Sequence, residues 1–442
     1  MAISKTKECY VYVTLPGQTE PVTAGRFVVD YVDPHAPVGI FVYRKSYLDR
    51  DDFIPLDPVN LPKSHSQYEQ HILDGLFGAF RDASPDFWGR QVIDRSKLAQ
   101  GGAVGFTDFE YLLNGPEDRV GALSFGTNKE PPPPVRDFSR RFNLTELMEL
   151  ATKIEEREVI EDSSAQGTQA EQLLLARTSM GGARPKASVW GESDGKLWLA
   201  KFKASKDRWN DPRVEHATLL LAKACGIRVV NTHVETIGGS DVLFSERFDR
   251  DTTDGLDLMK KKQVISGLTV LNDTDVASAR TRWSYPLLAA EIRKVSVEPD
   301  DDARELYRRM VFNALITNTD DHPRNHALMM DGRGWRLSPA YDLTPRPTIS
   351  PTRHHAMSVG KDAWGNPSSE GLTQTLLSQC DDFCYSQAQA EALIVRTRDI
   401  IQKSWESLFL VEGVKPVECD MLRSAFTPEV LLQGVEKLRK KR

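Results

Sequence analysis

Alternating apolar and polar positions dominate the first sixty residues of the chain. Between Tyr10 and Leu15, aromatic or hydroxyl-bearing residues alternate with aliphatic ones, and Pro16-Gly17 then supplies turn residues. Two more short runs, Arg26–Tyr31 and Val38–Tyr43, are separated by Asp, Pro and Gly. We therefore expect residues 9–60 to form several β-strands.

A helical period becomes prominent further along the chain. Residues 63–100 read as helical with a break at Ser84-Pro85, and residues 141–178 read as polar helices. Residues 186–250 read as strands with one helix, and from about residue 285 helices dominate, interrupted by one hairpin. Four consecutive prolines, Pro131–Pro134, cannot continue a helix or a central strand and predict a stiff linker. We therefore expect three parts: 1–130, β-rich with helices; 135–250, β-rich; and 251–442, mostly helical.

Composition narrows the class of protein. With 442 residues, 40% hydrophobic and 27% charged, the chain is expected to fold into two or three globular domains. The net charge of -6 makes it a poor nucleic-acid binder by itself. The first twelve residues resemble no signal peptide, and no apolar run approaches the ~20 residues of a membrane span. Five cysteines, an odd number, favour reduced thiols and a cytoplasmic location.

Two segments could contact nucleotide phosphates. In Ser179–Lys186, Gly181 and Gly182 allow backbone N–H groups to approach phosphate oxygens, although an ordinary glycine-rich turn would look the same. In the strand Leu197–Phe202, Lys201 shares a face with two leucines and needs a charged partner or a route to water. Glu215, in the helix that follows, could be that partner, and a solvent-facing edge-strand lysine is the alternative.

A loop and a hairpin supply oxygen ligands and a base. A buried helix is expected to end near Thr317, and Asp320 and Asn325 follow it; the carboxylate can take a hydroxyl proton and the amide can coordinate Mg²⁺. Helix capping or a turn would explain these residues equally well. Residues 328–337 read as strand, turn and strand, so Asn325 before the hairpin and Asp342 after it can reach one metal ion.

Lysine, glutamate, base, amide, hairpin and carboxylate follow one another in the order of protein kinases. Two other classes compete. A metal-dependent phosphohydrolase built on Asp320, Asp321 and His322 would need more ligands, and His354-His355, the remaining pair, is expected in a surface loop. An ATP-binding pseudokinase is disfavoured because every catalytic residue type is present.

With these motifs in view, the chain resembles the HipA family of serine/threonine kinases, the toxin half of bacterial toxin–antitoxin pairs. The resemblance rests on Tyr10–Phe27, Pro85–Arg90, Ser179–Lys186, Leu199–Phe202, Glu246–Arg250, Thr319–Asn325 and Pro339–Asp342. It implies an α+β, bilobal protein-kinase-like fold. Residues 1–130 would be an extra β-rich N-terminal subdomain, 135–250 the N-lobe and 251–442 a mostly helical C-lobe.

The resemblance also implies roles for individual residues. ATP and Mg²⁺ would be the cofactors, with Asp320, Lys201, Asn325 and Asp342 catalytic and Asn325 with Asp342 on the metal. The residues of the implied ATP site are Gly181, Gly182, Ala183, Arg184, Pro185, Lys186, Lys201, Glu246, Arg247, Phe248, His322, Pro323, Arg324, Asn325, Tyr341 and Asp342. Within this set, Glu246–Phe248 would be the hinge that meets adenine.

Regulation and partners are implied in the same way. Ser179 falls where the family autophosphorylates an inhibitory serine, an aminoacyl-tRNA synthetase is the implied substrate, and a HipB-like helix-turn-helix antitoxin is the implied partner, which would make most of any DNA contact. A co-repressor acting mainly through that antitoxin is the alternative function. The chain lacks an HRD triplet, and Leu343-Thr344 follows Asp342 in place of Phe-Gly, which argues against a kinase-style activation loop.

Overall fold

The computed structural model describes residues 6–99, 105–134, 144–145, 148–149, 184–191, 193–204 and 206–440. They form two compact units between which the chain passes several times. The first comprises Met1–Lys206, Thr236–Ile265 and Met329–Arg333, and the second comprises Asp207–Glu235, Ser266–Leu328 and Gly334–Arg442. The expected division at the proline run, with parts 1–130, 135–250 and 251–442, stays a prediction.

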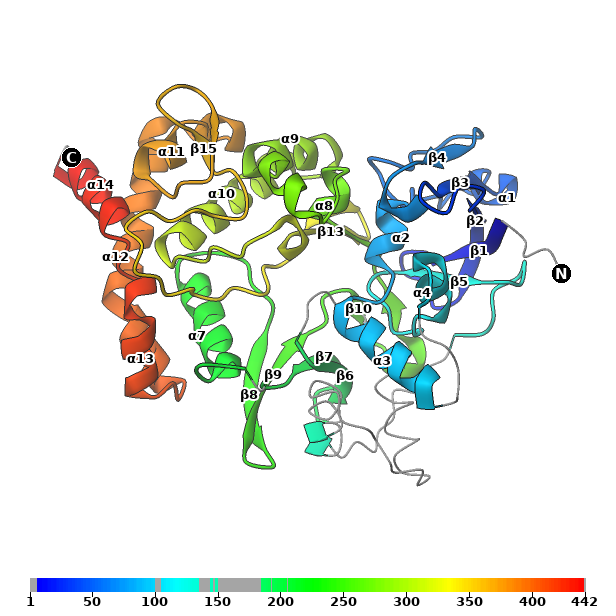
Figure 1. Cartoon of the computed structure of the whole chain (residues 1–442), viewed down its shortest axis with the longest axis horizontal. Coiled ribbons are helices and arrows are strands. Elements are labelled where there is room, and N and C mark those ends of the chain that lie inside the picture. The colour runs from blue at the N-terminus through cyan, green and yellow to red at the C-terminus, as the bar shows by residue number, and fades with distance from the viewer. Residues whose placement is uncertain are drawn as a thin grey trace. The chain divides into compact units, whose positions relative to one another are not determined.

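The first unit begins with a five-stranded antiparallel sheet in the order β4-β3-β2-β1-β5 (Figure 1). Its strands are β1 (Thr6–Thr14), β2 (Pro21–Asp30), β3 (Val38–Tyr43), β4 (Tyr68–Gln70) and β5 (Leu123–Gly126). The expected Pro16-Gly17 turn joins β1 to β2: Gly17 has a φ of 77°, and the N–H of Gln18 donates to the carbonyl of Leu15 at 3.0 Å. The strands expected between residues 9 and 60 are therefore confirmed up to Tyr43.

Aromatic side chains fill the space beside this sheet. The ring of Phe80 lies 5.0 Å from Phe27 and 5.4 Å from Phe41, in edge-to-face contact. The helices of this part of the chain are α1 (Lys45–Leu48), η1 (Leu73–Gly75), α2 (Gly78–Asp82), the longer α3 (Phe87–Ala99) and α4 (Asp108–Asn114). The expectation of helix throughout 63–100 is wrong before Gly78, where Leu73 and Asp74 have positive φ angles of 56° and 52° that no α-helix accepts.

A second sheet, in the order β6-β7-β9-β8, carries the lysine strand. Its strands are β6 (Lys186–Gly191), β7 (Lys196–Lys201), β8 (Thr232–Ile237) and β9 (Ser240–Glu246). One face is apolar: Trp88 and Val92 of α3 pack against Ala187, Trp198 and Phe244. Because side chains alternate along a strand, Leu197, Leu199 and Lys201 lie on the opposite face, as expected.

Short elements continue the chain toward the second unit. They are β10 (Arg250–Asp251), η2 (Leu256–Leu258), β11 (Lys260–Lys261) and β12 (Val264–Ser266). The expected hairpin between residues 328 and 337 is confirmed as β13 (Ala327–Asp331) and β14 (Gly334–Leu337), in a three-stranded sheet of order β12-β13-β14.

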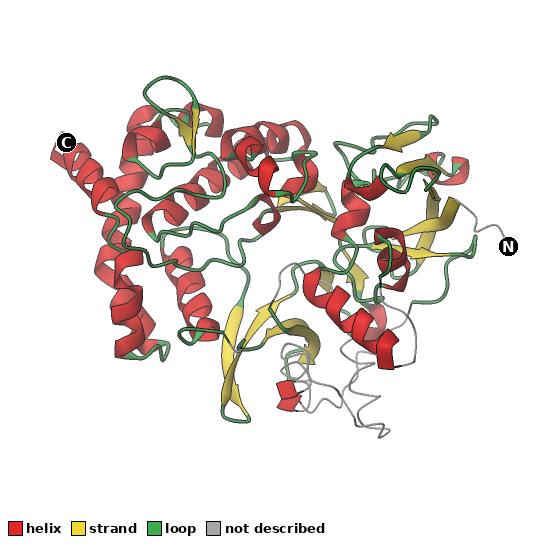
Figure 2. Ribbon diagram, in the orientation of Figure 1, coloured by secondary structure: helices red, strands yellow, loops and turns green. Residues whose placement is uncertain are grey.

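The second unit is mostly helical, as Figure 2 shows. Its longer helices are α7 (Asp211–Ala224), α9 (Tyr285–Val295), α10 (Pro299–Leu315), α12 (Gln387–Val411) and α14 (Glu429–Lys440). Its shorter elements are α8 (Gly267–Val270), η3 (Ala277–Arg282), η4 (Pro323–Asn325), α11 (Thr373–Leu377), η5 (Cys380–Phe383), α13 (Pro416–Leu422) and η6 (Arg423–Ala425). A second small hairpin, β15 (Gly360–Lys361) with β16 (Pro367–Ser368), was not expected.

Helix α10 is the core of the second unit. Proline at its first position and three aspartates in its first turn suit a helix N-terminus, where backbone N–H groups point outward. From Leu306 to Leu315 most of its side chains are buried. The mixed α+β class expected from the sequence is confirmed. Among the described residues, no helix combines the length and apolarity needed to cross a membrane.

Candidate functional site

The expected site residues are divided between the two units. Ser179, Gly181, Gly182 and Ala183 lie outside the described residues, so the glycine-rich segment is described only from Arg184 onward. The first unit holds Arg184, Pro185, Lys186, Lys201, Glu246, Arg247 and Phe248. The second unit holds Glu215, Asp320, His322, Pro323, Arg324, Asn325, Tyr341 and Asp342. Because Lys201 and Glu215 belong to different units, their pairing stays a prediction.

The loop after α10 presents Asp320 to solvent. The helix ends at Leu315, and Thr317 then adopts a φ of 55°, which is unusual for a β-branched residue. The Thr317 hydroxyl donates to the carbonyl of Ala425 at 2.6 Å, so the turn is anchored to η6 near the C-terminal end of the chain. Asp320 comes three residues later with 60% of its side chain exposed, which suits a base that must meet an incoming hydroxyl.

The approach of Asn325 to Asp342 stays a prediction, and two hydrogen bonds describe the surroundings of these residues. The Asn325 amide donates through Nδ2 to the carbonyl of Asp320 at 3.4 Å. The hydroxyl of Tyr341 donates to the carbonyl of Arg324 at 2.8 Å, and this bond links the segment that carries Asp342 to the residue before Asn325. Asp342 itself has a φ of 58°, a left-handed conformation that redirects the chain at this residue.

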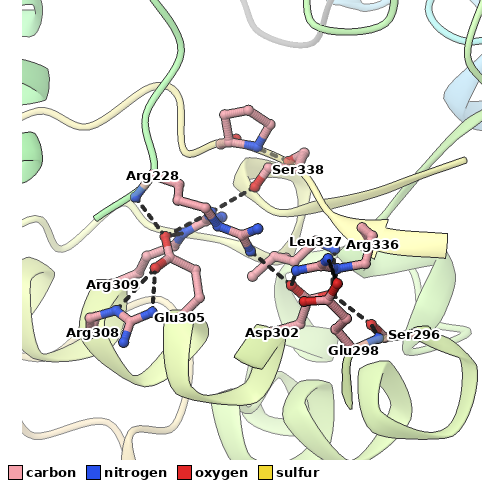
Figure 3. Close-up of polar contacts among 11 residues, drawn as sticks. Arg228, Ser296, Glu298, Asp302, Glu305, Arg308, Arg309, Arg336, Leu337 and Ser338 are labelled. Carbon is pink, nitrogen blue, oxygen red and sulfur yellow. Dashed lines mark hydrogen bonds and ion pairs between the residues drawn. The ribbon is translucent and has the colours of Figure 1, made fainter. Parts of the chain in front are cut away.

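A buried charge network positions the segment that carries Asp342 (Figure 3). Asp302 of α10 accepts from Nε of Arg336 at 3.0 Å and from the N–H of Leu337 at 2.9 Å, at the end of β14. One turn on, Glu305 pairs with Arg309 at 3.2 Å, and Arg309 donates to the carbonyl of Ser338 at 2.6 Å.

Arg228 completes this network. Its N–H donates to Glu305 at 2.9 Å and its guanidinium donates to Asp302 at 2.8 Å. Its carbonyl accepts from the N–H of Ala340 at 2.7 Å, two residues before Asp342. Both carboxylates belong to α10, whose end leads into the Asp320 loop. Helix α10 therefore leads into the Asp320 loop and also holds Leu337 and Ser338, shortly before Asp342 in the chain.

A second buried cluster surrounds Asp321, the residue after the base. Its Oδ2 accepts from Asn313 at 2.7 Å and from the hydroxyl of Tyr285, and it lies beside the ring of His326. Burial raises the pKa of Asp321, but the neighbouring His326 and the hydrogen bonds outweigh it, so the pKa lies below its ordinary value. Burial and the adjacent carboxylate raise the pKa of Tyr285 far above its ordinary value, so the phenol stays a proton donor.

In the first unit, Lys186 and Lys201 lie directly opposite each other on β6 and β7. Lys186 is 2% exposed, and its ammonium lies 2.6 Å from a carboxylate oxygen of Asp86, at the start of α3. This contact explains why the Pro85–Arg90 motif contains Asp86, because a buried ammonium needs a carboxylate partner. Lys201 is half-buried, at the end of its strand.

The expected hinge, Glu246–Phe248, is anchored by a buried salt-bridge network through the side chain of Arg247. Arg247 donates to Asp118 and to Asp249, both at 2.7 Å, and Arg250 donates to Asp249 at 2.6 Å. Burial raises the pKa of Asp249, but the charges of Arg247 and Arg250 outweigh it and the pKa is strongly lowered. The side chain of Arg247 therefore points into the protein and fixes the hinge backbone.

Several residues of these clusters were not among those expected from the sequence: Asp86, Asp118, Asp249, Tyr285, Asn313, Asp321 as a buried group and His326. Asp86 and Asp249 stand inside motifs that carried the family resemblance, and this was the available signal. The expectation of a surface loop for His354-His355 is half wrong: His354 is exposed, but His355 is buried and its Nδ1 lies 3.1 Å from the carbonyl of Asn318.

Residues 178–405, more than half of the chain, match the family model described as the HipA-like C-terminal domain. The chain therefore belongs to this family, and the resemblance noted from the motifs is confirmed. The protein of Sinorhizobium fredii named "Putative kinase Y4mE" is 26% identical over 366 residues, covering 76% of this chain and 79% of that protein.

Two further relatives come from Shewanella oneidensis. Its "Serine/threonine-protein kinase toxin HipA" is 26% identical over 142 residues, which cover 29% of this chain and 33% of the toxin. A solved structure of HipA with HipB and operator DNA contains a chain that superposes with a TM-score of 0.65 at 16% identity, over 97% of this chain and 99% of that one. This likeness shows that the two chains share a fold.

Proposed function

We propose that this chain is an ATP- and Mg²⁺-dependent serine/threonine protein kinase in which Asp320 is the catalytic base. One observation carries the proposal: the exposed carboxylate of Asp320 follows the buried helix α10, and the Asn325 amide folds back onto the Asp320 carbonyl. The names of the curated relatives, both kinases, support the same class.

The chain's own residues account for the proton transfer. As the acceptor serine oxygen forms its bond to the γ-phosphorus, the bond from that phosphorus to the β,γ-bridging oxygen breaks and its electrons leave with ADP. Asp320 takes the proton released by the serine hydroxyl. Its exposure allows a protein substrate to reach it, and the anchored Thr317 turn limits how far the carboxylate can move.

Asn325 and Asp342 are the residues that would hold Mg²⁺. An amide oxygen and a carboxylate are hard oxygen donors, which suit this ion, and the Asn325 nitrogen is already engaged with the Asp320 carbonyl. When bound, Mg²⁺ neutralises charge on the phosphate oxygens. The α10 network supports this role because it holds Leu337 and Ser338, shortly before Asp342 in the chain.

Nucleotide binding is assigned to the remaining expected residues. Gly181, Gly182, Ala183, Arg184 and Pro185 would cover the phosphates together with the backbone of Lys186, whose ammonium pairs with Asp86. Lys201 would reach the phosphates from β7. Glu246, Arg247 and Phe248 would meet adenine through backbone groups. His322, Pro323, Arg324 and Tyr341 would line the site beside the metal ligands.

Biological roles follow from the family. We assign the chain as a growth-inhibiting cytoplasmic toxin that phosphorylates an aminoacyl-tRNA synthetase and is silenced by phosphorylation of its own Ser179. A HipB-like antitoxin is the proposed partner, since the Shewanella structure contains HipA, HipB and operator DNA. DNA would be contacted through that partner, as the net charge of -6 suggests.

The test uses purified full-length protein, γ-labelled ATP and Mg²⁺. Wild type should incorporate phosphate, Asp320→Asn should lose ~10²–10⁴ of the rate, and Asp381→Asn, an exposed carboxylate of η5, should match wild type. Wild type that binds nucleotide but transfers no phosphate to itself or to cell proteins would contradict the proposal and favour the co-repressor alternative.

A further inference from the structure

The backbone around Arg346 is unusually restricted for an exposed loop. Arg346 stands between Pro345 and Pro347, so the φ angles of both neighbours are fixed and Arg346 itself is driven toward an extended conformation. Leu343 and Pro345 are buried, which anchors the segment on its N-terminal side. The N–H of Arg346 donates to the carbonyl of Thr317 at 3.2 Å.

That carbonyl links Arg346 to the catalytic loop. The carbonyl of Thr317 also accepts from the N–H of Thr319 at 3.0 Å, one residue before Asp320. Thr317 is fully buried in a left-handed conformation, and its hydroxyl is held by the carbonyl of Ala425. A strained, buried residue therefore directs one carbonyl toward both segments, and such strain persists where the surrounding structure requires it.

The side chain of Arg346 makes use of this placement. Its Nη2 lies 3.3 Å from Oδ2 of Asp320, with the two side chains 48% and 60% exposed. An ion pair at this exposure adds little to folding stability. The contact is therefore better explained by its effect on the carboxylate than by its effect on the fold.

We propose that Arg346 is a positioning residue for the phosphoryl transfer, which holds one oxygen of Asp320 so that the other faces the acceptor hydroxyl. The inference rests on the proposed kinase function and deepens it. In the reaction, Oδ1 of Asp320 accepts the proton of the hydroxyl whose oxygen attacks the γ-phosphorus, and ADP leaves. Throughout, the guanidinium keeps Oδ2 in place.

The chemistry of arginine suits this task. The guanidinium is charged at every pH the protein encounters and offers several N–H donors in one plane. A lysine at position 346 would keep the charge and lose the planar fork, whereas glutamine would keep a donor and lose the charge. These two substitutions therefore separate the contributions of charge and shape.

The experiment measures phosphate incorporation by the full-length protein over a range of ATP concentrations. Arg346→Gln should lower the maximal rate by about 10- to 100-fold, because small misplacements of a catalytic group have effects of this size. The ATP concentration at half-saturation should stay within about twofold and the thermal unfolding midpoint should not change, since the pair adds little stability. Arg346→Lys should recover most of the rate.

A double variant tests whether Arg346 acts through Asp320. In an Asp320→Asn background, which retains a slow residual rate, adding Arg346→Gln should cause no further loss. The matched control is Arg423→Gln, which removes a guanidinium of similar exposure, 46%, paired with Glu406 at 2.7 Å. It should leave the rate unchanged.

Three results would overturn the inference: a wild-type rate for Arg346→Gln, an equal fold loss in the Asp320→Asn background, or a loss explained by weaker ATP binding. The second result would assign Arg346 to direct stabilisation of the phosphoryl group. If wild type transfers no phosphate, both the proposed function and this inference are wrong. If wild type is active and Arg346→Gln has the wild-type rate, only this inference is wrong.

Discussion

The Nε2 atom of His326 lies 2.9 Å from Oδ2 of Asp321, and both side chains are buried in the loop that carries the exposed Asp320. Adjacent carboxylates thus have opposite environments. Asp320 faces solvent, whereas Asp321 is 0% exposed and accepts from Asn313 at 2.7 Å. We infer that the side chain of Asp321 fixes the loop to the core of the second unit and that the side chain of Asp320 does not anchor the loop.

This contrast predicts different effects of two neighbouring substitutions. Asp321→Ala should destabilise the protein by ~3–5 kcal/mol, because it removes one side of a buried charged cluster and leaves its donors unpaired. Asp320→Ala should change stability by no more than ~0.5 kcal/mol, as is usual for an exposed site. Urea unfolding of both variants measures the difference, and equal free energies of unfolding would contradict the assignment.

Substitutions of the two lysines that face each other across β6 and β7 should have different effects, one on stability and the other on activity. Lys186→Met leaves Asp86 buried without its ammonium and should cost ~3–5 kcal/mol of stability. Lys201→Met should instead lower the rate of phosphate transfer by roughly 10²-fold, the scale expected when a positive charge that stabilises the phosphates is removed. Thermal unfolding and rate measurements on each variant check both halves.

A specific control belongs with that pair. Asp86→Asn should destabilise the protein as Lys186→Met does, since each breaks the same ion pair. The double variant Asp86→Asn/Lys186→Met should be less destabilised than the sum of the single variants. Strict additivity would show that the 2.6 Å contact does not carry the effect.

The sequence predicted the features that local periodicity determines. The strands from Tyr10 to Tyr43, the shared face of Leu199 and Lys201, the helix that ends before Thr317 and the β13–β14 hairpin all follow from side-chain alternation or turn chemistry. The segment before Gly78 was misassigned, because Leu73 and Asp74 take left-handed conformations that helical spacing does not reveal.

Contacts between distant segments could not be predicted in the same way. Arg346 and Asp320 are 26 residues apart, Tyr285 and Asp321 are 36 apart, and Arg247 and Asp118 are 129 apart. Each pair depends on which surfaces pack together. The approach of Asn325 to Asp342, which a hairpin between them favours because it brings its two ends to the same place, stays a prediction.

Buried His355 predicts acid sensitivity. Burial lowers the pKa of His355; the hydrogen bond to the Asn318 carbonyl and the charge of Asp321 act against burial, and His354 acts with it. In the unfolded chain the His355 imidazole takes up a proton below about pH 6.5, whereas in the folded state its lowered pKa keeps it neutral to lower pH. Acid therefore favours unfolding. Stability should therefore fall by up to ~1.4 kcal/mol per pH unit below that value from this group.

The variant His355→Asn isolates this contribution. Its amide nitrogen can replace Nδ1 as the donor to the Asn318 carbonyl, but it carries no titrating group. The free energy of unfolding, measured in urea at pH 7 and pH 5.5, should decline less for the variant than for wild type. Parallel declines would show that another group controls the acid response.

The last prediction concerns the metal and exploits the backbone of Asp342. Its φ of 58° is a conformation that asparagine tolerates well and alanine does not, so Asp342→Asn removes the charge with little added strain. Because Mg²⁺ prefers charged oxygen ligands, the variant should need roughly tenfold more Mg²⁺ for half-maximal phosphate transfer, about 1.4 kcal/mol of binding free energy. Asp320→Asn, measured in parallel, should lose rate but keep the wild-type Mg²⁺ dependence of nucleotide binding, because Asp320 has no role as a ligand. Titrating Mg²⁺ while monitoring both nucleotide binding and transfer distinguishes the two variants, and an unchanged Mg²⁺ requirement in Asp342→Asn would remove Asp342 from the metal site.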